Sequence, residues 1–354
     1  MATRELIMKN LTYIFWKFIF YPALFSGLAG ALFFILSSEQ LSTYSPQLQR
    51  IPLPETTNLP LLRDVYARNQ VTRNSVKVWI EKKDWEAPPS FFTYGLPPWA
   101  YPWVNLDVGT DPIGHDLITL LGVNLKRPLA KLHYLEIGVS VGKCLFTQLQ
   151  YFGEGVLVFA YDLEEVNPTF SRMLVQGTEL DSWREEELRA GAVSQRRASG
   201  NEHIDTIKQF FSPAGGELRY LASDEYNYVG WARLAKQNVV FDLIYSDAFH
   251  TPEALLFEAN QFLPLLNKAN FAIVWDDCEG TMVTEAVCPI LEKLRTRPHA
   301  PPVFFNIFVI GGWMGENEAK HHTCVATSIN LASLVQQDDG LRKLERVNAC
   351  NQLK

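Results

Sequence analysis

Apolar runs alternate with amphipathic runs from about residue 105 onward. Short runs rich in β-branched and aromatic residues indicate strands, and the runs between them have helical spacing. Strands are predicted at 132–138, 156–162, 218–224, 241–247, 271–277, 302–312 and 323–331. Helices are predicted at 142–152, 228–238, 252–266 and 283–296, with a polar, helix-prone stretch at 170–211. This alternation predicts an α/β fold with a doubly wound, mostly parallel, seven-stranded sheet.

The segment at residues 18–36 departs from this pattern because it is apolar and carries no charge. A helix needs roughly 20 such residues to span a bilayer. Arg4, Lys9 and Lys17 precede it, so the positive-inside rule keeps the N-terminus cytoplasmic. We expect an uncleaved transmembrane anchor, hence a single-pass membrane protein with its main domain on the luminal or extracytoplasmic side. A cleaved signal peptide and a buried core helix are the alternatives.

Three parts of the chain follow from these patterns. Residues 1–37 would form a cytoplasmic tail and the anchor, and residues 38–104 a stem and cap. The stem is rich in Ser, Thr, Pro and Gln without a sustained period, which is typical of a linker. Residues 76–104 are dense in Pro and aromatic residues, which would cap a domain or line a pocket. Residues 105–354 would form the α/β domain.

Composition narrows the classes of partner and of site. The chain has 354 residues and a formal net charge of −7, which disfavours nucleic acid as a partner because phosphates would be repelled. Its five cysteines form no CxxC pair, so neither a zinc motif nor a dithiol motif is supported. Cys144 and Cys278 are interpreted as small buried apolar residues, although one disulfide in an oxidising compartment stays open.

A glycine-spaced turn joins the first predicted strand to the first helix. The spacing is E-x-G-x-x-x-G, with Glu136, Gly138 and Gly142. Gly138 would allow a tight turn and Gly142 a close backbone approach, while the helix offers free N–H groups. The pattern is neither a dinucleotide fingerprint nor a phosphate loop, because Cys144 follows Lys143 where Ser or Thr is needed. A purely structural turn is the alternative.

Two further carboxylates end the next two strands. Asp162 stands at the tip of the second strand, where it could accept hydrogen bonds from both hydroxyls of a ribose. Asp224 ends the third strand, where it could receive an adenine amino group. The alternative is a helix cap for Asp162 and a turn or cap residue for Asp224.

In this order, "YLEIGVSVGKCLFTQL", "VFAYD" and "DLIYSDAFH" resemble the first, second and fourth motifs of class I S-adenosylmethionine-dependent methyltransferases. The resemblance covers roughly residues 130–335 and implies a Rossmann-like sheet that binds S-adenosyl-L-methionine. It implies these cofactor contacts: Glu136, Gly138 and Gly142 at the methionine end, Asp162 at the ribose, and Asp224 near the adenine. Asp247 would pack near the cofactor sulfonium as the alternative to the metal-binding role considered next.

Carboxylates also follow the fourth and fifth strands. Asp247, Asp276 and Asp277 would concentrate negative charge at one edge, which a hard divalent ion such as Mg²⁺ would offset. The stretches "DLIYSDAFHTPEA" and "FAIVWDDCEG" resemble one branch of this superfamily, the macrocin-type sugar O-methyltransferases and cephalosporin-biosynthesis relatives. In that branch such carboxylates bind a metal that holds two substrate hydroxyls. This sequence departs from that branch at two positions, because Ala248 stands in place of its glycine and Pro252 in place of its tyrosine. The alternative is that Asp276 and Asp277 cap the next helix.

The resulting hypothesis is a membrane-anchored O-methyltransferase that acts on a hydroxyl of a sugar, a glycan or another polyhydroxylated small molecule. His250 has the pKa range of a general base, and Asp247 beside it would share the catalytic role. Two alternatives stay open: another enzyme class on the same fold, and a non-catalytic membrane-tethered binding or assembly protein.

Overall fold

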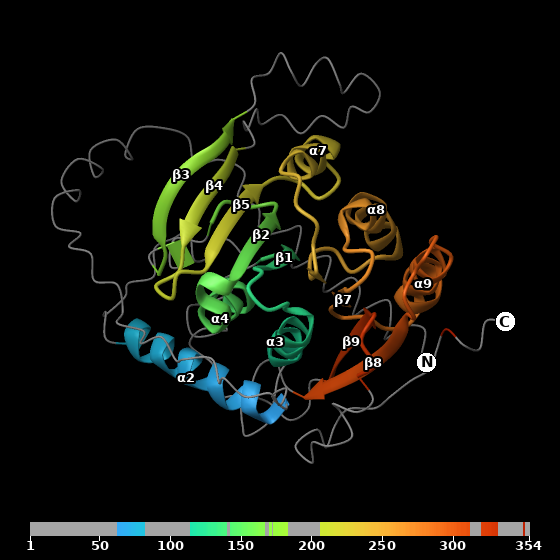
Figure 1. Cartoon of the computed structure of the whole chain (residues 1–354), viewed down its shortest axis with the longest axis horizontal. Helices are drawn as coiled ribbons and strands as arrows, with labels where there is room; N and C mark the ends of the chain where they lie inside the picture. Colours follow the sequence, from blue (N-terminus) through green and yellow to red (C-terminus); the bar gives the residue numbers. More distant parts are fainter. Residues whose placement is uncertain are drawn as a thin grey trace, which may run out of the picture.

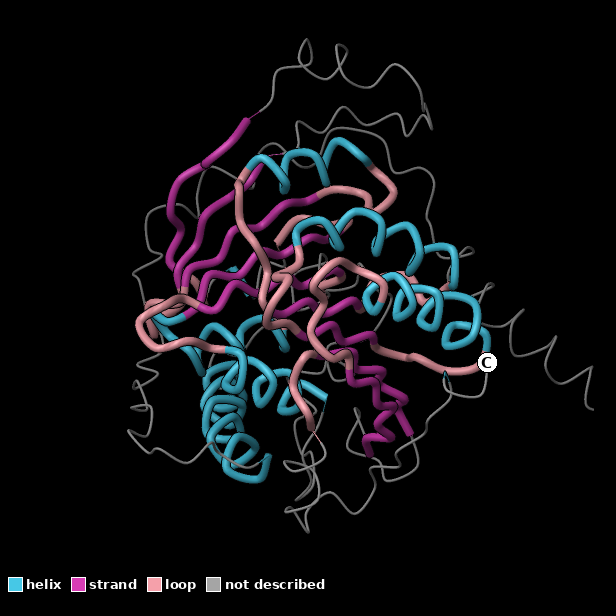
Figure 2. Tube along the Cα trace, turned by 45° about the vertical axis from the view of Figure 1, so that its right-hand side comes forward, coloured by secondary structure: helices cyan, strands magenta, loops and turns pink. Residues whose placement is uncertain are grey.

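The computed structural model describes residues 62–81, 114–139, 142–166, 170–171, 173–182, 206–311, 320–331 and 350. Within these ranges, one sheet lies between two layers of helices (Figures 1 and 2). The layer of α2 (Leu62–Glu81), α3 (Gly114–Leu125) and α4 (Lys143–Phe152) covers one face. The layer of α7 (Tyr228–Lys236), α8 (Pro252–Phe262) and α9 (Cys288–Arg295) covers the other. The predicted α/β architecture is therefore confirmed.

The described residues contribute nine strands to the sheet, in the order β3-β4-β5-β2-β1-β6-β7-β9-β8. Their bounds are β1 Leu132–Ile137, β2 Val156–Asp162, β3 Val175–Ser182, β4 Thr206–Phe211, β5 Glu217–Ala222, β6 Leu243–Ser246, β7 Ala272–Trp275, β8 Phe304–Gly311 and β9 Lys320–Thr327. The central strands β5, β2, β1, β6 and β7 run parallel. Strands β3, β4 and β9 each pair antiparallel with their neighbours.

The sheet has two more strands than the sequence predicts, because β3 and β4 come from the stretch at 170–211. The helix-prone interpretation of that stretch is wrong at residues 175–182 and 206–211, which form strands. Strand β4 buries only Ile207 and Phe210 fully, so its alternation is weak and its polar residues conceal it. Antiparallel pairing with β5, in which Ile207 lies opposite Leu221, decides the local structure.

The apolar core has two halves, one on each face of the sheet. Successive residues of β1 point to opposite faces, so Tyr134 joins the core under α3 and α4, whereas Leu135 and Ile137 join the other half. Strand β2 is buried along its whole length. Near-continuous burial of this kind explains why these strands read as apolar runs in the sequence.

Helix α2 spans residues 62–75 of the predicted linker and residues 76–81 of the predicted cap, so this part of the stem is helical. The helix packs on α3 and α4, and it buries Leu62 and Val65 in the core. Its apolar face was not evident in the sequence because much of its contact with the domain is polar.

The structure also bears on the predicted membrane localisation. Among the described residues, no helix has both the length and the apolar character needed to cross a bilayer. This contradicts the single-pass membrane localisation, which we therefore correct. The apolar segment at 18–36, on which that prediction was based, lies outside the described residues.

The strand order places a topological switch point at the centre of the sheet. From β1 the chain continues to β2 on one side, and later returns to β6 on the other side. In open α/β sheets, ligands bind outside the carboxyl ends of the strands at such a point. The tips of β1, β2 and β6 therefore define where a site is expected.

Cysteines tie the far edge of the sheet together. Cys278, just after β7, forms a disulfide with Cys324 of β9, and Cys288 of α9 forms one with Cys350. Cys144 is free and buried, as predicted. Cys278 is also buried, but it is covalently paired rather than a simple apolar residue.

We expect the Cys278–Cys324 disulfide to stabilise the edge formed by β7 and β9. Its loop closes over 46 residues, and a crosslink of that span typically contributes about 2–4 kcal/mol. Replacing both cysteines with alanine should lower the urea midpoint accordingly. Cys144→Ala, which removes a buried but unpaired thiol, is the control. Equal losses in the two variants would show that the crosslink itself adds nothing.

Candidate functional site

The carboxyl ends of the parallel strands bring the predicted residues to one edge of the sheet. The main-chain N–H groups of Gly138, Ser223, Asp247 and Asp276 each donate to a carbonyl of a neighbouring strand, at 2.7–3.0 Å. Asp162 is the last residue of β2, between β1 and β5. The turns that follow these strands therefore start side by side, as the sequence predicts for strand-tip residues.

The glycine turn between β1 and α4 requires glycine at both predicted positions. Gly138 has φ of 81° and Gly142 has φ of 78°, a left-handed conformation that side chains disfavour. A Cβ at Gly138 would overlap the main chain of Asp247. A Cβ at Gly142 would press against the ring of Phe170, 2.7 Å away. The main chains of the β1 and β6 tips thus meet without an intervening side chain.

Asp162 holds this turn in place. One oxygen of its carboxylate accepts the N–H of Val139, and the other accepts the N–H of Glu164 at 2.8 Å. Residues 163–166, which follow Asp162, are not helical, so these contacts hold two turns and are not the helix cap of the alternative interpretation. Contact between Asp162 and a ribose stays a prediction.

Asp224 follows β5 at the same edge and is exposed. Its carboxylate accepts the N–H of Tyr226 at 2.9 Å, which makes it a turn residue in the described structure. Leu163, after β2, is 64% exposed. A polar turn and an uncovered apolar side chain thus lie beyond adjacent strand tips. Contact between Asp224 and adenine stays a prediction.

Glu136 is buried and joins β1 to α4. The hydroxyl of Tyr134 donates to its carboxyl group at 2.6 Å, and the main chain of Leu145 also hydrogen-bonds it. Burial raises the pKa of Glu136 to about 8, against the partial opposition of these hydrogen bonds. Glu136 is therefore mostly protonated at neutral pH, so it supports the turn rather than presenting a charge to a ligand.

Asp247 and His250 form a pair at the tip of β6. His250 Nε2 lies 3.5 Å from Asp247 Oδ1, and His250 Nδ1 lies 3.2 Å from the main-chain oxygen of Asp276. A carbonyl only accepts, so Nδ1 carries the hydrogen in this contact, and Nε2 is the nitrogen that faces Asp247. Burial raises the pKa of Asp247 well above its usual value, and the nearby Asp276 carboxyl raises it further. The side chain nevertheless remains 28% exposed, so a ligand could reach it.

The carboxylates predicted to bind a metal do not converge. Asp276 is buried and its Oδ1 accepts from the hydroxyl of Thr323 at 3.4 Å, whereas Asp277 is exposed. The described residues contain no group of three or more His, Cys, Asp or Glu side chains that could hold a metal ion. Asp247, Asp276 and Asp277 therefore do not fit the predicted Mg²⁺ site.

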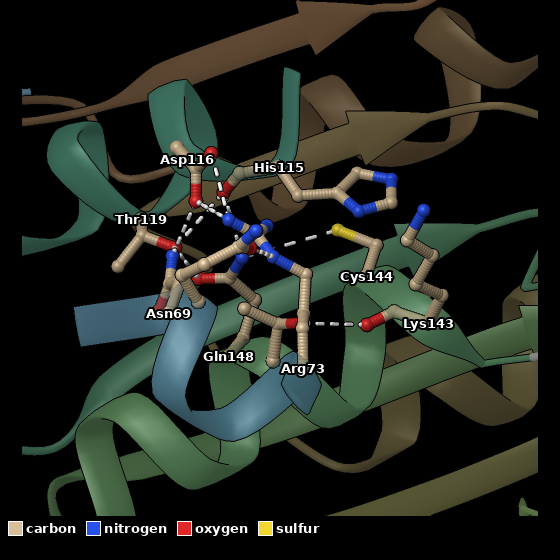
Figure 3. Close-up of polar contacts among 10 residues, drawn as sticks. Asn69, Arg73, His115, Asp116, Thr119, Lys143, Cys144 and Gln148 are labelled. Atoms are coloured by element: carbon tan, nitrogen blue, oxygen red, sulfur yellow. Dashed lines mark hydrogen bonds and ion pairs between the residues drawn. The ribbon is translucent and has the colours of Figure 1, made fainter. Parts of the chain in front are cut away.

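A polar network behind the glycine turn was not predicted from the sequence. It connects α2, α3 and α4 (Figure 3). Arg73 and Asp116 form an ion pair at 2.9 Å with both side chains fully buried. Asn69 donates to Asp116 at 2.8 Å, and Thr119 donates to Gln148 at 2.9 Å. The signal was hidden because Arg73 and Asn69 lie in the presumed stem, far in sequence from their partners.

Lys143, the first residue of α4, lies next to this network and is only 5% exposed. Its Nζ has no hydrogen-bond partner among the residues that the structure describes. Burial and, to a smaller extent, the positive charge of Arg73 together lower the pKa of Lys143 to about 7. The sequence had suggested only that Lys143 does not belong to a phosphate loop.

Comparisons with known proteins give a consistent but weak likeness. No family model matches the chain, and no curated protein matches it. Among solved structures, it is similar to an O-methyltransferase from Bacillus cereus in complex with SAH. The two sequences are 11% identical, the match covers 75% of this chain and 99% of that chain, and the TM-score is 0.39.

Two further structures show the same degree of likeness. One is TomG, an O-methyltransferase from Streptomyces achromogenes involved in tomaymycin synthesis, in complex with SAM. It is 14% identical, the match covers 73% of this chain and 97% of that chain, and the TM-score is 0.37. The other is cofactor-bound Rv0187 from MTB, which is 12% identical. The match covers 72% of this chain and 96% of that chain, and the TM-score is 0.38. With such low identities and TM-scores, these likenesses do not establish the activity of this chain.

We expect Gly138→Ala to destabilise the fold by roughly 2–4 kcal/mol, because it adds both backbone strain and a clash with the β6 tip. Gly280→Ala is the matched control, since Gly280 also has a positive φ of 57° but nothing lies within 4 Å of a Cβ there. Urea denaturation of both variants separates the clash from the strain. A Gly138→Ala loss no larger than that of Gly280→Ala would contradict the close approach.

Glu136 should make stability depend on pH. Its folded-state pKa, about 8, lies above its ordinary value of 4.5, so the folded state holds an extra proton between these limits. Stability should therefore fall as pH rises from about 4.5 to 8, by at most about 1.4 kcal/mol per pH unit. In Glu136→Gln this slope should become shallower, although Asp247, whose pKa is also raised, still contributes to it. The exposed change Glu285→Gln should leave the slope as it is in the wild type. Parallel slopes for wild type and Glu136→Gln would refute the assignment.

Proposed function

We propose that this chain is an S-adenosylmethionine-dependent O-methyltransferase that acts on a hydroxyl of a sugar, a glycan or another polyhydroxylated small molecule. The observation that carries the proposal is the meeting of the β1 and β6 tips. There, a left-handed glycine turn at the topological switch point lies against Asp247, which pairs with His250. The turn that would bind the cofactor is thus next to His250 and Asp247, which would accept the proton.

The residues present fit a nucleoside that carries an amino-acid end. Main-chain groups of the glycine turn at Gly138 and Gly142 would border that amino-acid end. Asp162, the last residue of β2, stands at the neighbouring strand tip, where its carboxylate would accept from the ribose hydroxyls. Asp224 lies at the adjacent tip, where the resemblance implies the adenine.

S-adenosylmethionine, when bound, supplies a methyl group that its sulfonium already activates. The protein must then bind the acceptor hydroxyl, orient it and remove its proton. The proton would pass to Nε2 of His250, whose Nδ1 hydrogen is held by the main-chain oxygen of Asp276. Asp247 beside Nε2 would stabilise the resulting imidazolium. No step involves a metal, because the predicted ligands do not form a site.

The first test is binding. Calorimetry of the full chain with S-adenosylhomocysteine, the product form of the cofactor, should show saturable binding. Absence of binding would reject the proposal. Binding without methyl transfer to any member of a panel of hydroxylated acceptors, followed by product mass, would favour a non-catalytic binding protein on the same fold.

His250 provides the catalytic test once an acceptor from that panel is known. His250→Gln should reduce the rate of methyl transfer about 10²- to 10⁴-fold, because general base catalysis contributes that much. Binding of S-adenosylhomocysteine should persist. His299→Asn, which changes an exposed histidine beyond α9, should leave both unchanged. Near-normal turnover in His250→Gln would remove His250 from the mechanism.

A further inference from the structure

Two glutamates that the proposed mechanism does not use lie buried beside the candidate site. Glu225 belongs to the turn between β5 and α7 and is 5% exposed, and Glu258 of α8 is fully buried. Burying a carboxyl group is costly unless hydrogen bonds or an opposite charge offset the loss of water. The contacts of these two side chains therefore have to account for their burial.

Those contacts leave three carboxyl oxygens without a donor. Oε2 of Glu258 accepts from the hydroxyl of Ser246, the last residue of β6, at 2.6 Å. Oε1 of Glu258 and both oxygens of Glu225 receive no hydrogen bond from the described residues. The two carboxyl groups nevertheless lie within hydrogen-bonding reach of each other. Ionised carboxylates only accept, so one of the two has to carry a proton before they can bond.

The acidic neighbours of the pair also favour a bound proton. Burial raises the pKa of Glu258 well above its ordinary value, and the Glu225 carboxylate raises it further. Burial raises the pKa of Glu225 too, and the Asp224 and Asp162 carboxylates add to this, while hydrogen bonding to Glu258 opposes it. Ionising both glutamates would therefore place a second negative charge in a buried, already acidic region.

No cation on the described elements around α8 pairs with either carboxyl group. Arg233 is buried on α7, but it donates to neither of them. Lys293 of α9 donates to Asn260 instead, at 2.9 Å. Segment η5 (Met282–Val287) packs on α8, and its Glu285 is exposed. A proton is therefore the ion that can offset the pair.

The two glutamates touch both turns of the candidate site. Glu225 lies in the turn after β5, where the indole N–H of Trp231 donates to its main-chain oxygen at 2.7 Å. The main chain of Phe249, in the turn after β6, approaches the Glu225 carboxyl group. Glu258 holds Ser246, the residue immediately before Asp247. A bond between the two carboxyl groups thus ties these turns to each other and to α8.

We propose that Glu258 and Glu225 share one proton, and that this proton joins the turn after β5 to α8 and so positions the turn after β6. Oε1 of Glu258 carries the proton and donates it to the Glu225 carboxylate, because Oε2 already accepts from Ser246. We call the two carboxyl groups with their proton the carboxyl clasp. Its loss would leave two like charges side by side, and the turns would separate.

The direction of the pH effect follows from the raised pKa. The folded chain keeps this proton above pH 4.5, the ordinary pKa of a glutamate, so the clasp is closed at low pH and opens as pH rises. Glu258→Gln replaces the shared proton with an amide hydrogen that does not titrate, and its carbonyl oxygen can still accept from Ser246. The clasp in this variant should stay closed at every pH.

The titration of the two carboxyl groups tests the shared proton directly. In the full chain labelled with 13C at glutamate Cδ, Glu225→Gln and Glu258→Gln identify the two signals by their absence. Both signals should move at one common midpoint above 4.5 in the wild type, because coupled groups titrate as a pair. In Glu258→Gln, the Glu225 midpoint should fall. Independent titrations near 4.5, or an unchanged Glu225 midpoint, would overturn the proposal.

Amide exchange tests whether the proton holds the turn. After correction for the intrinsic effect of pH, exchange at residues 247–251 should quicken about tenfold from about pH 6 to about pH 9 in the wild type. It should not quicken in Glu258→Gln. Asp247 is intact in both chains, so its own ionisation cancels in the comparison. Glu253→Gln, which changes an exposed carboxylate of α8, should behave as the wild type does. Equal quickening in the wild type and Glu258→Gln contradicts the clasp.

The consequence for ligand binding rests on the proposed function. The ratio of the S-adenosylhomocysteine dissociation constants at about pH 9 and about pH 6 should be about tenfold larger in the wild type than in Glu258→Gln, because a site that is mostly open binds more weakly. Equal ratios would remove the positioning role and overturn the proposal. If this nucleoside binds at neither pH, the proposed function is rejected, and the carboxyl titration and amide exchange still decide the clasp.

Discussion

The close approach of two main chains at the centre of the sheet is the constraint on which the candidate site depends. Gly138 lies against the backbone of Asp247 and has a positive φ, a conformation that glycine adopts far more readily than other residues. This contact fixes the β1 turn relative to the β6 tip. It thereby fixes the distance between the turn that would hold a nucleoside and the His250–Asp247 pair that would accept a proton. Asp162 adds a hydrogen bond from the β2 side.

Much of the central fold could be predicted from the sequence because parallel strands are buried on both faces. β1, β2, β5, β6 and β7 read as short apolar runs, and each ends within two residues of a position that the sequence analysis selected. The polar strands β3 and β4 were misread as helix-prone, because the pairing of β4 with β5 and of β3 with β4 decides their structure, and local propensity does not show that pairing.

The candidate site also has a part that could be predicted from the sequence and a part that could not. Positions on the strand tips follow from topology, so Gly138, Asp162 and Asp247 were found at one edge. Side-chain convergence does not follow from topology, and the three aspartates expected to share a metal point to different surroundings: a histidine, a threonine and solvent. Arg73 was overlooked for the opposite reason. It meets Asp116 only because α2 packs on α3, a contact that no local spacing encodes.

The Arg73–Asp116 pair has a consequence for how the chain can be divided. The predicted domain boundary at residue 104 separates Arg73 from Asp116, although both are fully buried against each other. A fragment that begins at residue 105 would leave the Asp116 carboxylate in an apolar interior without its cation, and breaking a buried pair in this way typically costs about 3–5 kcal/mol. The smallest autonomous folding unit therefore has to begin before α2.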